Sequence, residues 1–457
     1  MLTDKLHSLL DSDHFDYDHL RSMFLTLCLD QFFICFIGVV STALVSSVGE
    51  AAIAAVSMVG TINAMVSLIF TSLASGGAIV VSRAKGRGER NEIREAIGEV
   101  TGLCGFTATV LAILMILFSQ GIVDFIYPEV EEILRDYAVR YMRLMAISFI
   151  PYSVFCAIFN IFRSVGDTRS ALVLTMVINV AHLMLSLLFI NGMHLGVDGS
   201  GLSYIIARLL GMVLALIWLL RIHNDYGVRP GHFFRFHRSI TREIVSLGMP
   251  LTMESLLMQG GMLLVQIYLA RLTTTDLAAH AVANSLLLLY QITAGAMNTI
   301  VGTVCGQCYG AGEDELTRRY IRNIIFVGRF VLLVSVLILY PLTPLLLQLY
   351  HASPAGSGIA SSCLLIAAIA MPILWCDANL LGMGLRVAGD SMYVGTVSVL
   401  ALAIGRLVIG YILTIPMGLG VQGVWISMVI EWLLRAVALR LRFRGDRWLH
   451  REAPKAA

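Results

Sequence analysis

The sequence predicts an all-α membrane protein of twelve transmembrane helices in two six-helix bundles. Three observations predict it: an apolar composition, long uninterrupted apolar runs and an internal repeat. Of 457 residues, 58% are hydrophobic and only 14% are charged, whereas a soluble domain carries ~25% charged residues. Only helices or closed barrels satisfy the backbone polar groups inside lipid. The apolar runs extend over twenty or more residues without alternation, which favours helices over a barrel.

Twelve apolar segments follow one another along the chain. A membrane-spanning helix needs about 20 residues, and each segment meets that length. Their approximate bounds are 23–46, 51–82, 94–118, 133–162, 170–191, 197–220, 247–271, 276–308, 320–349, 357–385, 391–414 and 420–441. The second, fourth and eighth segments are longer than one crossing requires. We therefore expect these three to tilt or to project from the membrane.

The two halves of the chain repeat each other. Residues 26–96 align with residues 250–320 at a constant offset of 224, without a gap. Further along, Arg-Ser-Val-Gly-Asp at 163–167 matches Arg-Val-Ala-Gly-Asp at 386–390 at an offset of 223. Each half has six segments, an even number, so both halves have the same topology. We expect a pseudo-two-fold axis along the membrane normal, not an inverted repeat.

A polar stretch rich in Arg and His joins the two halves. We predict an N-terminal six-helix lobe at 1–222, a cytoplasmic linker at 223–246, and a C-terminal six-helix lobe with a basic tail at 247–457. Lys and Arg gather in the loops after even-numbered segments and in this tail. Cytoplasmic loops carry such an excess, so both termini are predicted to be cytoplasmic. The acidic N-terminus lacks the features of a signal peptide, so the chain is expected in the plasma (inner) membrane, uncleaved.

Two acidic residues occupy equivalent places in the repeat. The offset of 224 superimposes Asp30 on Glu254, each early in an apolar run. An ionisable side chain inside the bilayer is costly and marks a functional site by default. One carboxylate cannot serve a proton or Na⁺ and a cationic substrate at once, so either residue could exchange one for the other. The alternative is a purely structural role, in which each carboxylate only forms hydrogen bonds to neighbouring helices.

Other polar residues inside the segments are candidates for lining a central cavity. An intramembrane arginine must pair or face water, so Arg406, which aligns with His182, has Asp30 or Glu254 as candidate partners. The other polar residues could line a cavity or only hold helices together. Arg208 could pair with an acid or extend to the lipid interface. The predicted cavity-lining residues are Arg406, His182, Asn179, Asp377 and Asn284.

Several function classes receive no support. The Cys305-Gly-Gln-Cys308 pair has no second pair or spaced histidines beside it, so we expect no metal site apart from possible Na⁺ at Asp30 or Glu254. The glycine turns at 86–88 and 310–312 lack the Gly-Lys-Ser/Thr ending of a phosphate loop. No basic patch interleaved with aromatic residues suggests nucleic acid. We therefore expect neither an enzyme nor a cofactor.

The residues resemble the multidrug and toxic compound extrusion (MATE) family over about 23–441. The resemblance is carried by Ser41-Thr-Ala-Leu-Val-Ser-Ser-Val-Gly-Glu-Ala-Ala-Ile-Ala-Ala-Val-Ser57, Asp276-Leu-Ala-Ala-His-Ala-Val-Ala-Asn284, Val301-Gly-Thr-Val-Cys-Gly-Gln-Cys-Tyr-Gly-Ala-Gly312 and Leu385-Arg-Val-Ala-Gly-Asp390. It implies twelve helices in two lobes, a V-shaped central cavity and extrusion of organic cations by Na⁺ or H⁺ antiport. The chain is identified as a prokaryotic type of this family.

The chain departs from the family pattern at three positions. Many members carry an Asp where this chain has Ser41, and some carry an Asp where it has Leu183. Many also place the acid of the seventh helix where this chain has Met258. The coupling site therefore rests on this sequence's own repeat, at Asp30 and Glu254.

The sequence thus predicts a secondary active exporter of multiple drugs and organic cations, driven by H⁺ or Na⁺ antiport with alternating access. Its partners would be small organic cations, the coupling ion and the lipid bilayer, and we expect a monomer. The alternative is a flippase of lipid-linked glycans or phospholipids from the same superfamily. Such flippases line the cavity with several cationic side chains, for which Arg406, Arg208 and His182 are the candidates here. A membrane scaffold or receptor would not explain the matched acids.

Overall fold

Helices account for every regular element that the structure describes. The computed structural model describes residues 15–45, 50–126, 128, 132–193, 195–222, 224–349 and 353–449, and none of these lies in a strand. Two of the helical pieces, η3 and η6, are short 3₁₀ helices, whereas η1, η2, η4 and η5 are π-helical. The all-α prediction is confirmed.

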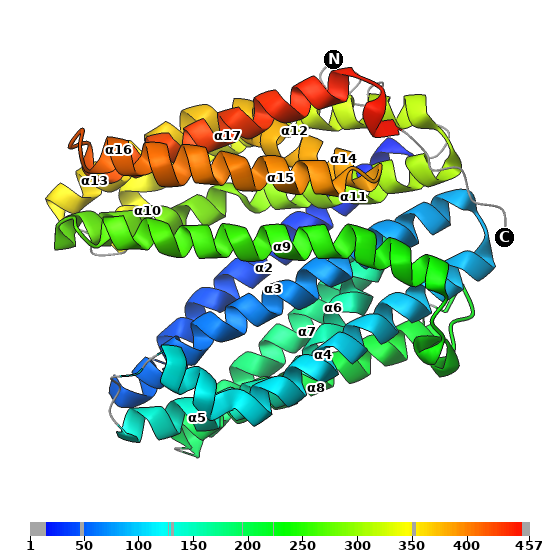
Figure 1. The fold of residues 1–457 in the computed structure, drawn as a ribbon, viewed down its shortest axis with the longest axis horizontal. Helices are drawn as coiled ribbons and strands as arrows, with labels where there is room; N and C mark the ends of the chain where they lie inside the picture. The colour runs from blue at the N-terminus through cyan, green and yellow to red at the C-terminus, as the bar shows by residue number, and fades with distance from the viewer. Residues whose placement is uncertain are drawn as a thin grey trace. The chain divides into compact units, whose positions relative to one another are not determined.

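The helices follow one another as shown in Figure 1. The first half contains α2 (Tyr17–Val45), α3 (Glu50–Arg87), α4 (Arg90–Ile126), α5 (Glu132–Ile147), α6 (Phe149–Ser164), α7 (Thr168–Ser186), η1 (Leu187–Gly192), α8 (Gly196–Ile217) and η2 (Trp218–Ile222). After η3 (Pro230–Phe234), the second half contains α9 (Arg238–Leu269), α10 (Thr274–Tyr290), α11 (Ile292–Ala311), α12 (Asp314–Leu349), α13 (Pro354–Ala370), η4 (Met371–Leu380), α14 (Leu381–Val387), α15 (Ser391–Ala401), η5 (Leu402–Ile409), α16 (Gly410–Thr414), α17 (Gly420–Arg444) and η6 (Arg447–Leu449).

These helices reproduce the predicted segments and their repeat. Joined across bends and π-helical turns, they form one helical stretch for each of the twelve segments. Helix α3 spans Glu50–Arg87, and the pair α10 and α11 spans Thr274–Ala311, so both ends differ by 224. Among the described residues, eight helices are long and apolar enough to cross a membrane, or up to ten if each bent pair is one span. The twelve helical stretches match the twelve segments that the sequence predicts.

Two of the three long segments bend. The fourth bends by 42° between Ile147 and Phe149, and the eighth bends by 47° between Tyr290 and Ile292. Pro151 explains the first bend, because its ring lacks an N–H group and clashes with the carbonyl four residues earlier, that of Ile147. At the second bend no proline is present, and the Gln291 amide is shared between the Leu287 and Leu288 carbonyls.

The contacts between residues divide the chain into two units. One unit consists of Leu29–Thr252, and the other combines Met1–Cys28 with Met253–Ala457. The chain passes between the units inside α2, after Cys28, and inside α9, after Thr252. These two passages are 224 residues apart, so they are equivalent in the repeat. Asp30 and Glu254 each lie two residues beyond a passage.

Within the unit Leu29–Thr252, the polar linker between the halves packs against α4. A Cβ atom on Gly102 would lie 1.9 Å from the Phe233 carbonyl oxygen, and one on Gly98 would lie 2.6 Å from the His232 Cβ. The buried Glu99 accepts hydrogen bonds from the His237 amide, at 2.7 Å, and from the Thr241 hydroxyl. This carboxylate therefore caps the start of α9, where amide groups lack partners and negative charge is favoured.

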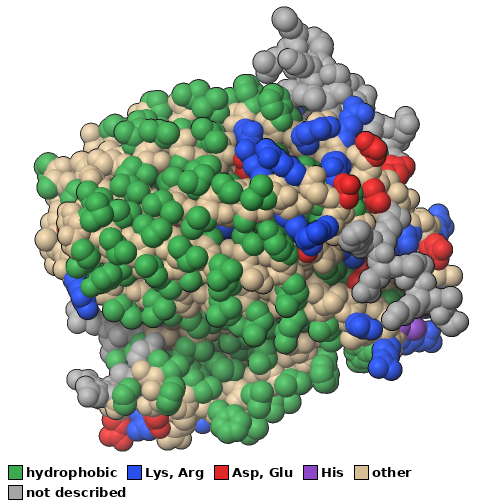
Figure 2. All heavy atoms as spheres, turned by 45° about the horizontal axis from the view of Figure 1, so that its top comes forward, with side chains coloured by type: hydrophobic (Ala, Val, Ile, Leu, Met, Phe, Trp, Pro, Cys, Tyr) green, Lys and Arg blue, Asp and Glu red, His purple; other side chains and the backbone are tan. Residues whose placement is uncertain are grey.

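Side chains on the surface separate by polarity. Hydrophobic side chains cover most of the face seen in Figure 2, and charged side chains gather toward its margins. Leu117, Ile267, Leu337 and Ile369 are among the large apolar residues that are more than half exposed. Such a surface is costly in water and suits a bilayer.

Candidate functional site

Asp30 is a buried acid that lacks a hydrogen bond of full geometry to the described residues. It lies in α2, its residue is 1% exposed, and neither carboxylate oxygen makes a hydrogen bond to any described residue. The Arg163 guanidinium acts on its carboxylate through its positive charge, and the Thr175 hydroxyl acts as a donor toward it, outside full hydrogen-bond geometry. Most buried polar groups in proteins are hydrogen-bonded, and an exception needs an explanation. Burial without a full hydrogen bond disfavours the bare negative charge, so this carboxylate is suited to taking up a proton or a small cation.

Glu254, the equivalent acid, is held by an arginine. Nη2 of Arg386 donates to both of its carboxylate oxygens, at 2.7 and 2.6 Å, and both residues are buried. Arg435 adds a second positive charge nearby. Arg386 belongs to the repeated Arg-x-x-Gly-Asp motif, in which Arg163 is its counterpart. The repeat therefore preserves an acid and an arginine in each unit.

The two acid and arginine sets differ in how far the acid is satisfied. Glu254 has its charge balanced at hydrogen-bond distance, while the oxygens of Asp30 remain unsatisfied. Removing one partner from a buried ion pair leaves an uncompensated charge. Of the two predicted coupling acids, Asp30 is therefore the one whose charge state can change without breaking an ion pair.

Arg406 pairs with a residue that was not among its predicted partners. Its Nε lies 2.9 Å from Oε2 of Glu431 in α17, so the expected pairing with Asp30 or Glu254 was wrong. Arg406 lies in η5, where the Tyr268 hydroxyl donates to its backbone carbonyl at 3.0 Å. Gly405 lets α17 approach, because a Cβ there would meet the Glu431 backbone at 3.0 Å. The rotation of α17 against η5 selects this partner.

Asp377 is also neutralised. It lies in η4, its side chain is 4% exposed, and it contacts Arg329 at 2.7 Å and Arg440 at 2.5 Å. π-helical turns are frequent at functional sites, and both Asp377 and Arg406 lie on one. In each case the side chain is occupied by opposite charge, so these residues are structural ion pairs in this conformation.

The acid and arginine network of the unit Met253–Ala457 was only partly foreseen. Glu431 and Arg435 are four residues apart in α17, with Arg435 Nη1 lying 3.6 Å from Glu431 Oε1. Their charges inside the last apolar segment were the available signal. The sequence did not indicate which of these side chains would pair, because that depends on how each helix is rotated about its axis.

The remaining predicted cavity-lining residues differ in their burial. His182 and Asn179 are half-buried on α7, while Asn284 on α10 is exposed. The His182 ring lies 4.1 Å from that of Tyr204, centroid to centroid. The side chain of Ser41 lies outside what the structure describes. Cys305 and Cys308 are buried and are not joined in a disulfide.

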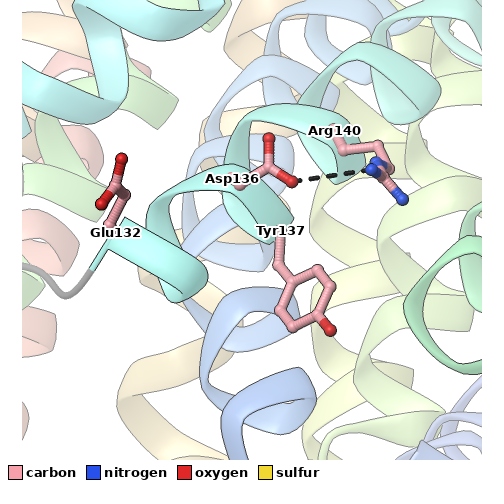
Figure 3. A pocket seen from close by; sticks show the side chains of 4 residues that line it. All are labelled: Glu132, Asp136, Tyr137 and Arg140. Atoms are coloured by element: carbon pink, nitrogen blue, oxygen red, sulfur yellow. Dashed lines mark ion pairs between the residues drawn. The ribbon is translucent and has the colours of Figure 1, made fainter.

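One pocket lies at the start of α5. Figure 3 shows Glu132, Asp136, Tyr137 and Arg140 around it, all from this one helix. The Asp136 carboxylate pairs with Arg140 at 3.6 Å, and both side chains are more than half exposed. This open, solvated pocket lacks the buried polar groups of a binding site.

Comparison with known proteins finds matches along nearly the whole chain. The MatE family model matches residues 27–188 and 250–412, one match in each half. The probable multidrug resistance protein NorM of Thermotoga maritima is 21% identical over 415 residues, covering 90% of this chain and 88% of that protein. Its counterpart from Bradyrhizobium diazoefficiens is 25% identical and covers 88% of this chain and 87% of its own length.

Solved structures show the same fold. The Vibrio cholerae MATE transporter VcmN in the bent form has a TM-score of 0.82 at 19% identity, covering 93% of this chain and 96% of that one. A transporter from Pyrococcus furiosus, described by a reverse polarity of its binding pocket, has a TM-score of 0.84 at 17% identity, covering 93% and 94%. The family match, its division between the halves and the shared fold agree, and the chain is a multi-span membrane transporter that belongs to the MatE family.

Proposed function

We propose that this protein exports small organic cations across the plasma (inner) membrane in exchange for H⁺ or Na⁺. Curated relatives over nearly the whole length are named as probable multidrug resistance proteins, which supports drugs as substrates. No ATP-binding motif occurs in the sequence, so an ion gradient is the proposed energy source. Both termini would be cytoplasmic, and the exporter would work as a monomer.

The buried, unsatisfied carboxylate of Asp30 carries this proposal. A carboxylate in an apolar interior is stable only when it is neutral or paired with a cation. Neither oxygen of Asp30 makes a hydrogen bond to a described residue. A proton or Na⁺ arriving there would satisfy the group, and its departure would leave a negative charge available to a cationic substrate. Binding of one cation would therefore exclude the other.

Glu254 would have a supporting role. Its ion pair with Arg386 already balances its charge, so we propose that it stabilises its unit while Asp30 exchanges the ion. In the export cycle, ion uptake at Asp30 from outside would release the substrate. The two lobes would then change their orientation, release the ion inside and load new substrate. This coupling needs one site of exclusive occupancy and two alternating accesses.

The flippase alternative is less well supported. It requires several free cationic side chains to bind the phosphates of a lipid-linked substrate. Arg406, its principal candidate, is paired with Glu431 at 2.9 Å. Arg208 alone supplies one positive charge, which does not balance a pyrophosphate.

Efflux from proteoliposomes tests the proposal. Vesicles carrying the wild-type protein or Asp30→Asn would be loaded with ethidium, and its exit followed under an imposed H⁺ or Na⁺ gradient. We expect the wild type to export under one of the two gradients, and Asp30→Asn to lose gradient-driven export by at least about tenfold. A second acidic site, Asp198→Asn, serves as the control, since that residue is solvated and pairs with the exposed Arg140.

Two results would refute the proposal. Wild-type export rates in Asp30→Asn would remove Asp30 from the coupling step. Flipping of a labelled lipid, with no ethidium movement under either gradient, would favour the flippase alternative.

A further inference from the structure

Arg208 is a buried cation without an acidic partner. It lies in α8 and is 8% exposed, yet among the described residues no Asp or Glu forms an ion pair with it. Its Nη1 donates to the Ser148 hydroxyl at 2.6 Å. Its guanidinium lies 4.2 Å from the Tyr152 ring centroid and 5.1 Å from that of Tyr204. The positive charge is thus held in place but not balanced.

The remaining donors of Arg208 make no hydrogen bond to a described residue. A guanidinium has five N–H donors, and only the bond to Ser148 uses them. Nε and Nη2 make no hydrogen bond to a described residue, and neither is sealed inside the protein. The rings of Tyr152, His182 and Tyr204 that surround the guanidinium are half-buried. The free edge of the guanidinium is therefore not completely enclosed by the protein.

That edge does not face lipid. On α8 the exposed apolar residues Leu209, Val213 and Ile217 form one face, and helical spacing places Tyr204 and Arg208 on the opposite one. On α7 the exposed Val173, Val177 and Val180 likewise lie opposite the polar residues. The polar face of α7 consists of Thr175, Asn179, His182 and Ser186. Helices α7 and α8 pack together, so their polar faces meet inside the unit.

We propose that Arg208 binds the carboxylate of an amphiphilic substrate, with the Tyr152 and Tyr204 rings packing against its apolar body. The planar guanidinium fork matches the geometry of a carboxylate and can bind it bidentately. One unbalanced positive charge is neutralised by one carboxylate. A pyrophosphate carries more charge than a single arginine can balance, so the site does not suit a lipid-linked phosphate.

The site also indicates what the rest of such a substrate would carry. On α7, Thr175 acts on Asp30 and His182 lies beside Tyr204. Seven residues separate them, a rise of about 10 Å along the helix. A zwitterion could place its carboxylate at Arg208 and its cationic group toward Asp30. This substrate class rests on the proposed export function, whereas binding of the carboxylate can be tested without transport.

A matched pair of dyes tests the site by binding. Rhodamine B carries a free carboxylate, and rhodamine B ethyl ester has the same fluorophore with that group blocked. Fluorescence anisotropy of each dye with purified protein gives the ratio of the two affinities. We expect Arg208→Gln to shift this ratio against rhodamine B by about tenfold or more, since a hydrogen bond between charged groups is worth at least that factor. Arg208→Lys should retain part of the preference.

Arg140→Gln is the matched control, because Arg140 belongs to the same unit but is exposed and pairs with acids. It should leave the ratio unchanged. If Arg208 has only a structural role, Arg208→Gln will lower the affinity for both dyes equally or for neither. Either result would overturn the proposed site. So would a wild-type protein that does not bind rhodamine B. If Arg208→Gln does not fold, the ratio of the two dye affinities is measured for Arg208→Lys instead, and an unchanged ratio would overturn the site. Retained selectivity without gradient-driven efflux would overturn the export function and leave the site standing.

Discussion

Arg386 holds the Glu254 carboxylate by both oxygens, at 2.7 and 2.6 Å. The equivalent residues of the other half, Arg163 and Asp30, interact electrostatically, yet the Asp30 oxygens make no hydrogen bond to a described residue. Gene duplication alone would leave two similar pairs. Here one acid is compensated by an ion pair and the other is not, which supports the proposal that Glu254 stabilises its unit while Asp30 exchanges the ion.

The Glu254 ion pair should be a stability element. Breaking it by Glu254→Gln or Arg386→Gln leaves a buried charge without compensation, and each should cost about 3–5 kcal/mol. The double variant Glu254→Gln/Arg386→Met should recover most of that loss. Unfolding in mixed detergent micelles would measure all three. Additive losses in the double variant would show that the two residues do not interact.

Asp377 should show a non-additive response to loss of its two arginines. Arg329 and Arg440 are 34% and 49% exposed, so solvent screens each contact and either single change to Gln should cost ~1 kcal/mol or less. Together they leave the 4% exposed carboxylate unpaired, and the double variant should cost several kcal/mol. The same unfolding assay applies. A double-variant cost equal to the sum of the singles would contradict this reading.

The linker between the halves should depend on Gly102. Gly102→Ala would place a Cβ 1.9 Å from the Phe233 carbonyl oxygen, so the backbone must move, at a cost of about 1–3 kcal/mol. Gly121 lies in the same helix α4 with nothing within 4 Å of its ideal Cβ. Gly121→Ala should stabilise by about 0.5–1 kcal/mol, because alanine loses less backbone entropy. Thermal denaturation of both variants compares them, and equal shifts would contradict the packing.

Glu99 should keep the start of α9 ordered. Glu99→Gln removes the negative charge that accepts from the His237 amide and the Thr241 hydroxyl. Amide hydrogen exchange over residues 232–241 should then accelerate by roughly fivefold, corresponding to ~1 kcal/mol for a lost cap. Glu95→Gln, a half-buried acid of the same helix, is the control. Unchanged exchange in Glu99→Gln would show that the cap does not hold this segment.

Much of the fold could be predicted from residue types. The apolar runs and the offset of 224 predicted the number and order of the helices, as α3 and its counterpart α10 with α11 show, whereas α9 begins nine residues before its predicted segment. The bend after Tyr290 was not predictable from the sequence, because no proline produces it. The linker between the halves packs along α4 through the small residues Gly98 and Gly102. Such contacts depend on two distant segments and leave no periodic signal.

The candidate site was predictable only in part. Burial of Asp30, Glu254 and Asp377 followed from their places inside apolar runs. The partner of each charge did not, because helix rotation decides which side chains meet. Arg406 therefore lies against Glu431, four residues before Arg435. The surroundings of Arg208 had the same origin, because Tyr152 comes from α6, far from Arg208 in sequence.

Ion release on substrate binding tests the central claim most directly. Purified protein in weakly buffered detergent would be mixed with ethidium while a pH indicator follows H⁺ and an electrode follows Na⁺. Since one carboxylate cannot hold both cations, the wild type should release about one ion per bound substrate. Asp30→Asn should release none, while Glu254→Gln, where folded, should still release it. Undiminished ion release from Asp30→Asn would contradict the assignment of Asp30 as the coupling acid.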